Sequence, residues 1–104
     1  MANVFNIARE YGRTLGGRWK RLGDYSGEEF FETKLEPLFL EARRQNRAVT
    51  IELDGTTGYP SSFLDQSFGE LARRYGKDDV RRFVNLKGKV FGWVADYINQ
   101  ELWS

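Results

Sequence analysis

A short run of apolar and β-branched residues, AVTIEL at positions 48–53, lies between two longer segments with helical periodicity. Apolar side chains recur every three or four residues on both sides of it: Phe31, Leu35, Leu38 and Ala42 before it, and Leu64, Phe68, Leu71 and Tyr75 after it. A buried strand that connects two amphipathic helices belongs in a sheet on which both helices pack. The pattern therefore predicts an α/β fold.

Other segments also have the composition of regular elements. Residues 3–8 (NVFNIA) and 80–86 (VRRFVNL) are typical of strands, and residues 89–103 are typical of a closing helix. The inner face of that helix is predicted to carry Val90, Val94, Ile98 and Leu102. We expect a mixed sheet of about four to five strands with three helices, in a single domain spanning residues 1–104.

The glycine-rich stretch at 12–23 (GRTLGGRWKRLG) precedes the first long helix. It predicts a hairpin, with residues 14–15 and 18–20 as short arms around a Gly-Gly turn. The stretch is also basic and is a candidate to cradle a phosphate through its backbone N–H groups, with Arg18 as a candidate ligand-binding residue.

Two residues mark the course of the first long helix. The spacing Ser26-x-x-Glu29 is that of a capping box, in which each side chain accepts a hydrogen bond from the backbone of the other residue. Pro37 falls within the helix and predicts a kink, because proline removes one backbone hydrogen bond.

Composition restricts the chemistry open to this chain. It has 104 residues, a net charge of +1, no cysteine and no histidine, so disulfides, thiolate chemistry and histidine-based catalysis are excluded. No apolar run approaches the ~20 residues of a membrane span, and the first residues lack the features of a signal peptide. We expect a cytoplasmic protein without membrane attachment, cofactor or metal. The near-neutral charge argues against nucleic-acid binding, although bases cluster at 9–21 and 73–89.

The triplet Asp54-Gly55-Thr56 follows the central strand and suggests phosphate chemistry. It resembles the Asp-x-Asp-Gly-Thr signature of haloacid-dehalogenase-type phosphatases, but Glu52 occupies the position of the nucleophile. The alternative function is therefore a small phosphate- or nucleotide-handling enzyme or binder, using Asp54, Thr56 and Arg18. Glu52, Asp54 and Asp65 are also candidates to surround a divalent cation, since hard ions favour carboxylates.

Ser61 and Ser62 precede the second long helix. The spacing Ser62-x-x-Asp65 predicts that Ser62 is the helix N-cap, which explains the residue without any further role. A phosphate on Ser62 would instead add about two negative charges at a helix N-terminus, where anions are stabilised. Both interpretations remain open from the residues alone.

Several short stretches together resemble the STAS-like domain family of uncharacterised prokaryotic proteins. These are Ser26 to Phe30 (SGEEF), the mid-helix Pro37, the pairs Asp54-Gly55 and Gly58-Tyr59, and Ser61 to Leu64 (SSFL) leading to Phe68-Gly69. The resemblance covers residues 5–86. It implies a small α/β module, related in fold to the STAS domains of anti-sigma-factor antagonists and sulphate transporters, that binds proteins and catalyses nothing.

In the anti-sigma-factor antagonists, a serine at the start of the corresponding helix is phosphorylated by a partner kinase. The resemblance places Ser62 at that position, although Pro60 and Phe63 replace the usual neighbours of the serine pair. It therefore implies a protein partner of the kinase or ATPase type and a contact surface made of six residues: Tyr59, Ser61, Ser62, Phe63, Asp65 and Gln66.

The last predicted helix carries two large rings, Trp93 and Tyr97, on its flank. They lie four residues apart, and both a role in the core and a role as an anchor for another chain are consistent with their spacing.

Overall fold

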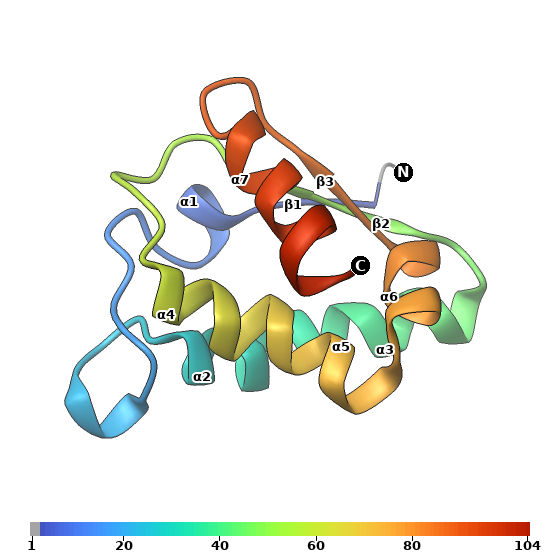
Figure 1. Ribbon diagram of the computed structural model, residues 1–104, viewed down its shortest axis with the longest axis horizontal. Coiled ribbons are helices and arrows are strands. Elements are labelled where there is room, and N and C mark those ends of the chain that lie inside the picture. Colours follow the sequence, from blue (N-terminus) through green and yellow to red (C-terminus); the bar gives the residue numbers. More distant parts are fainter. Residues whose placement is uncertain (1–2) are drawn as a thin grey trace.

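Three parallel strands form the sheet of this protein, shown by a computed structural model that describes residues 3–104 (Figure 1). The strands are β1 (Val4–Asn6), β2 (Val49–Glu52) and β3 (Val84–Lys87), and they lie side by side in the order β1-β2-β3. In this register Phe5 is opposite Ile51, which is opposite Leu86. The α/β class is confirmed, whereas the predicted mixed sheet of four to five strands is wrong.

Five helical segments accompany the sheet within residues 3–104, in addition to a short 3₁₀ turn at Lys20–Leu22. Two short ones are α1 (Ile7–Glu10) and α6 (Lys77–Phe83). The other three each contain one π-helical turn: 27–45 (α2 Gly27–Phe30, turn Phe31–Leu35, α3 Glu36–Gln45), 61–75 (α4 Ser61–Leu64, turn Asp65–Gly69, α5 Glu70–Tyr75) and 92–102 (α7 Gly92–Tyr97, turn Ile98–Leu102). The predicted count of three helices omitted α1 and α6.

The two faces of the sheet differ in burial. Successive side chains of a strand point to opposite faces, and Phe5, Val49, Ile51 and Val84 on one face are buried. The opposite face carries Thr50, Glu52, Asn85 and Lys87, none of which is buried. Helices 27–45 and 61–75 lie next to each other along one side of the sheet in Figure 1. The crossover helices thus cover the apolar face and leave a polar face open.

Aromatic rings fill the centre of the core. Phe30 is fully buried, and its ring lies 5.5 Å from that of Phe63 and 5.9 Å from that of Phe68. Trp103 is 1% exposed, and its indole N–H donates a 2.9 Å hydrogen bond to the carbonyl of Phe68. That carbonyl lies in the π turn of helix 61–75, so the end of the chain is bound to an irregular part of the helix.

The start of helix 27–45 confirms one half of the predicted capping box. Ser26 is the N-cap, and its hydroxyl accepts a 3.0 Å hydrogen bond from the Glu29 N–H. The Glu29 carboxylate does not return to Ser26 but accepts from the Tyr11 hydroxyl and the Tyr25 N–H. The irregularity expected near Pro37 takes the form of the π turn, which ends directly before α3 and places the proline in the first turn of α3.

The predicted hairpin around Gly16 and Gly17 is wrong. Residues 12–18 are an irregular loop, in which the Gly16 N–H donates to the Tyr25 carbonyl at 2.8 Å. The carbonyls of Gly17 and Arg18 accept hydrogen bonds from the N–H groups of Gly27 and Glu28, at 2.8 and 3.0 Å. These backbone groups satisfy the free N-terminal donors of helix 27–45 instead of pairing with each other in a ladder.

Two other predicted boundaries differ from the structure. The segment 80–86, expected as one strand, is helical through Phe83 and becomes a strand only at Val84. Val80 and Phe83 are buried at helical spacing, so helix α6 buries apolar groups that a strand would have placed on both faces. The last helix begins at Gly92 rather than Lys89, which leaves Val90 in a loop, where the residue is 71% exposed.

Candidate functional site

The first turn of helix 61–75 carries the serine pair. The helix begins at Ser61, Pro60 occupies the cap position, and no side chain caps it. The predicted N-cap role of Ser62 is therefore wrong, because the helix begins before Ser62 and the residue lies inside the first turn. Ser61 is exposed and Ser62 is half-buried, and the hydroxyl of neither has a hydrogen bond to any of residues 3–104.

The glycine-rich loop lies beside this turn. The Ser62 hydroxyl is 3.9 Å from the place that a Cβ atom on Gly17 would occupy, which is an ordinary van der Waals distance, so the loop backbone and Ser62 are close neighbours. The backbone of Gly17 and Arg18 is held in place by the bonds to the start of helix 27–45. The two long helices and the loop thus meet at Ser62.

Helices 27–45 and 61–75 approach closely at this point because of a glycine. A Cβ atom on Gly27 would lie 2.5 Å from the carbonyl oxygen of Phe63. The Phe63 side chain is fully buried against the Phe30 ring. Phe63, expected at the partner surface, is therefore a core residue and offers no area to a partner.

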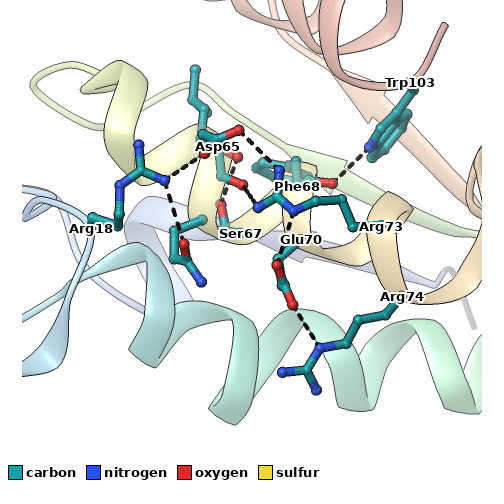
Figure 2. Close-up of polar contacts among 10 residues, drawn as sticks. Arg18, Asp65, Ser67, Phe68, Glu70, Arg73, Arg74 and Trp103 are labelled. Atoms are coloured by element: carbon teal, nitrogen blue, oxygen red, sulfur yellow. Dashed lines mark hydrogen bonds and ion pairs between the residues drawn. The ribbon is translucent and has the colours of Figure 1, made fainter.

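Arg18 connects the loop to helix 61–75 (Figure 2). Its guanidinium donates to the Asp65 carboxylate at 2.5 Å and to the Gln66 side-chain oxygen at 3.4 Å. Arg73 binds the same carboxylate from the next turns of the helix, at 3.1 Å. The hydrogen bonds from Arg18 and then from Arg73 hold the pKa of Asp65 below its ordinary value, against the opposing effect of burial.

The ion pairs continue along the helix to its neighbour. Glu70 accepts hydrogen bonds from Arg73 at 3.0 Å and from Arg74 at 2.8 Å, as Figure 2 shows. Arg74 also lies 3.5 Å from Glu36 of helix 27–45. The charges at this surface are therefore neutralised in a chain of pairs that begins at Arg18 and runs along helix 61–75 from Asp65 to Arg74.

Tyr59 lies at the edge of the same surface and has a structural role there. Its hydroxyl donates a 2.6 Å hydrogen bond to the Leu53 carbonyl, and its ring meets the Phe91 ring edge-on at 5.1 Å. Burial raises the pKa of Tyr59 to about 12. Tyr59 thus fixes the loop between β2 and the helix, and only part of its ring faces outward.

Asp54 is bound to the loop after β3. Its carboxylate accepts hydrogen bonds from the N–H groups of Lys89 at 2.7 Å and Phe91 at 2.9 Å. These two bonds, that of Lys89 first, hold the pKa of Asp54 below its ordinary value. The Thr56 hydroxyl is buried and has no hydrogen-bond partner in the described part of the chain. Because Arg18 is paired with Asp65 instead, the three residues of the phosphate hypothesis do not converge.

The other candidate groupings are also separated. Glu52, Asp54 and Asp65 do not gather, and residues 3–104 contain no cluster of three side chains suited to bind a metal. Trp93 is 61% exposed and does not complete the core, whereas Tyr97 is partly buried against it. No helix within the described residues is long and apolar enough to cross a membrane.

One feature of the surface was not predicted from the sequence. Arg9 and Arg13 line a hollow at the carboxyl ends of β1 and β2, together with Asn6, Asp54 and Gly55. The sequence offered no signal for it beyond a general excess of bases at 9–21, because the residues come from segments that are far apart in the chain.

This fold and surface define a class of protein. It is a small parallel α/β domain with a serine pair at the start of the helix that follows its central strand. Consistent with this class, a family model described as a STAS-like domain of unknown function matches residues 26–88, which is more than half of the chain. The chain belongs to this STAS-like family. Neither the curated proteins nor the solved structures gave a significant match.

Proposed function

We propose that this domain is a non-catalytic protein-binding module whose contact surface surrounds the start of helix 61–75. The exposed parts of Tyr59, Ser61, Ser62, Asp65 and Gln66 form that surface, with Arg18 at its border. We further propose that phosphorylation of Ser62 regulates binding. One observation carries the proposal. Ser62 lies between the glycine-rich loop, whose backbone is anchored, and the Arg18–Asp65 ion pair, and its hydroxyl makes no hydrogen bond to the described residues.

The position of Ser62 gives phosphorylation a physical effect. Asp65 lies three residues further along the same helix and therefore next to Ser62 on its surface. A phosphate on Ser62 would repel the Asp65 carboxylate and attract the Arg18 guanidinium, which now binds Asp65 at 2.5 Å. The new charge would thus exchange the partner of Arg18 and alter the contact surface without unfolding the helix.

Ser61 is the neighbouring acceptor and provides a comparison. It is exposed, whereas Ser62 is half-buried and faces the loop at Gly17. A phosphate on Ser61 would project into solvent and leave the Arg18–Asp65 pair intact. The two serines therefore differ in the effect that a phosphate would have on the Arg18–Asp65 pair, and this difference does not depend on which of them is more accessible.

The test is capture of the tagged full chain from its native host under gentle conditions, followed by mass spectrometry of bound proteins and of Ser61 and Ser62. The expected result is a stoichiometric partner that binds the unmodified chain and the Ser62→Ala variant but is lost with Ser62→Asp. Phosphate on Ser62 in a fraction of the unbound chain would support the switch directly.

Asn85→Asp is the matched control, because it adds the same charge to the open face of the sheet. It should retain the partner. Equal binding of Ser62→Asp and the unmodified chain would overturn the switch, and loss of the partner in Asn85→Asp would show a general charge effect. Recovery of the chain alone would argue against the binding module itself.

A further inference from the structure

A hollow of about 460 Å³ lies at the carboxyl ends of strands β1 and β2. In parallel sheets this end is where ligands bind, because the connecting loops converge there. Its lining comes from three parts of the chain: Asn6 at the end of β1, Ala8, Arg9 and Arg13 just after it, and Asp54 and Gly55 after β2. None of these residues belongs to the contact surface proposed above.

The backbone that forms the hollow is held by specific bonds. The Asn6 side chain accepts from the Arg9 N–H at 2.9 Å and donates to the Asp54 carbonyl at 3.4 Å. The Arg13 carbonyl accepts from the Thr57 N–H at 2.8 Å. These bonds join the two loops, so the walls are part of the folded structure rather than a chance approach of side chains.

Gly55 closes the hollow tightly against helix α1. Its φ is +107°, in the region that favours glycine, and a Cβ atom there would lie 2.8 Å from the Ala8 side chain. Two independent reasons thus require a glycine at this position: the backbone conformation and the lack of space for a side chain.

The arginines of the hollow have charged groups but no partners. Among residues 3–104 neither the Arg9 nor the Arg13 guanidinium makes an ion pair or a hydrogen bond. Other arginines of the chain do, such as Arg18, Arg73 and Arg74. Two arginines with unpaired guanidinium groups line one hollow, in a protein that pairs many of its arginines, and this is consistent with a negatively charged ligand.

The nearby carboxylates do not cancel this charge. Glu10 binds the Asn6 N–H at 2.9 Å and lines a different hollow, between β1 and α3. Asp54 lies at the wall, but its two oxygens accept from the N–H groups of Lys89 and Phe91. Two arginines and one carboxylate therefore line the hollow, which leaves an excess of one positive charge among its lining residues.

We propose that this hollow binds the phosphate group of a small phosphorylated molecule, with Arg9 and Arg13 as the binding residues. A phosphate carries about two negative charges near neutral pH and offers oxygens in several directions, which two guanidinium groups from different segments are able to contact. The volume is within the range of small-ligand pockets, so a phosphate attached to a sugar or nucleoside fits the space. Inorganic phosphate shares the same chemistry.

The test is titration of the isotope-labelled full chain with inorganic phosphate and, separately, with adenosine monophosphate, followed by amide chemical shifts at constant ionic strength. We expect saturable shifts at Arg9, Arg13 and Gly55, with dissociation constants below about 1 mM for at least one probe. Tighter binding of adenosine monophosphate identifies a phosphorylated metabolite as the ligand, and equal binding identifies the phosphate group alone.

Arg9→Gln and Arg13→Gln should each weaken binding at least roughly tenfold, because each removes a charge-assisted hydrogen bond. Arg21→Gln makes the same change of net charge outside the hollow, and its dissociation constant should stay within about twofold of that of the unmodified chain. Arg9→Lys, which keeps the charge, provides a second variant if Arg9→Gln fails to fold. The proposal is overturned if neither probe saturates, or if Arg21→Gln weakens binding as much as the hollow variants do.

Discussion

Arg18 and Asp65 lie 47 residues apart in the chain and are joined by a 2.5 Å ion pair. The pair fastens the glycine-rich loop to the helix that carries Ser61 and Ser62. The side chains of Arg18 and Asp65 are 33% and 36% exposed, so solvent screens the attraction. The pair therefore acts mainly to position the loop, and it contributes little to overall stability.

The first prediction concerns the strength of this pair. A double-mutant cycle with Arg18→Gln and Asp65→Asn should give a coupling free energy of ~0.2–1 kcal/mol, as for other partly exposed pairs. Denaturant unfolding of the four proteins provides the measurement. A coupling several times larger would show that the loop folds only with the pair.

The same carboxylate predicts a dependence of stability on pH. The hydrogen bond from Arg18 lowers the pKa of Asp65 in the folded protein below the ordinary value of 3.8. The stabilisation is then fully present above that ordinary value and is lost as the pH falls through the lower, folded value. Unfolding measured below about pH 5 should show a smaller loss of stability in Asp65→Asn than in the unmodified protein. An identical pH profile would contradict the assignment.

The two helix-start serines should respond differently to alanine. Ser26 is buried and caps its helix through the Glu29 N–H, so Ser26→Ala should lower the free energy of unfolding by about 1 kcal/mol or more. Ser62 makes no capping bond, so Ser62→Ala should change it by less than about 0.5 kcal/mol. Thermal or denaturant unfolding compares the two directly. A large loss in Ser62→Ala would restore the cap interpretation.

Asp54 should control the order of the loop after β3. Its carboxylate accepts hydrogen bonds from Lys89 and Phe91, and Asp54→Ala removes both acceptors. We expect faster hydrogen exchange at these two amides, with exchange in β2 unchanged. Asp54→Asn keeps one acceptor oxygen and should give an intermediate effect. Unchanged protection of both amides in Asp54→Ala would show that the loop is ordered by other contacts.

Gly27 should be sensitive to any side chain. A Cβ atom there would overlap the Phe63 backbone, so Gly27→Ala should destabilise the protein by about 1–3 kcal/mol despite the better helix propensity of alanine. Gly92→Ala is the matched control, because it also lies in the first turn of a helical segment and has open space around it. That change should be neutral or stabilising by up to ~1 kcal/mol. Equal stability of the two variants would show that the helices separate easily.

Local pattern was sufficient for the main elements of this fold. The spacing of apolar residues placed the central strand and both long helices within a residue or two of their positions in the structure, and the capping serine Ser26 was predicted from four letters. These features depend on neighbours along the chain, because helix period, strand period and caps are properties of short segments. The family resemblance followed from the same segments and is confirmed by the match over residues 26–88.

Contacts between distant segments were decided only by the tertiary structure. The glycine-rich loop has the composition of a hairpin, but its carbonyls are used by the start of helix 27–45, so no ladder forms. Phe63 stands beside two serines in sequence, yet the helix turns it into the core while Ser61 remains exposed. Arg18 pairs with Asp65 and not with the Asp54 loop. Each outcome depends on which segments meet in space, and a short stretch of sequence carries no information about a partner outside that stretch.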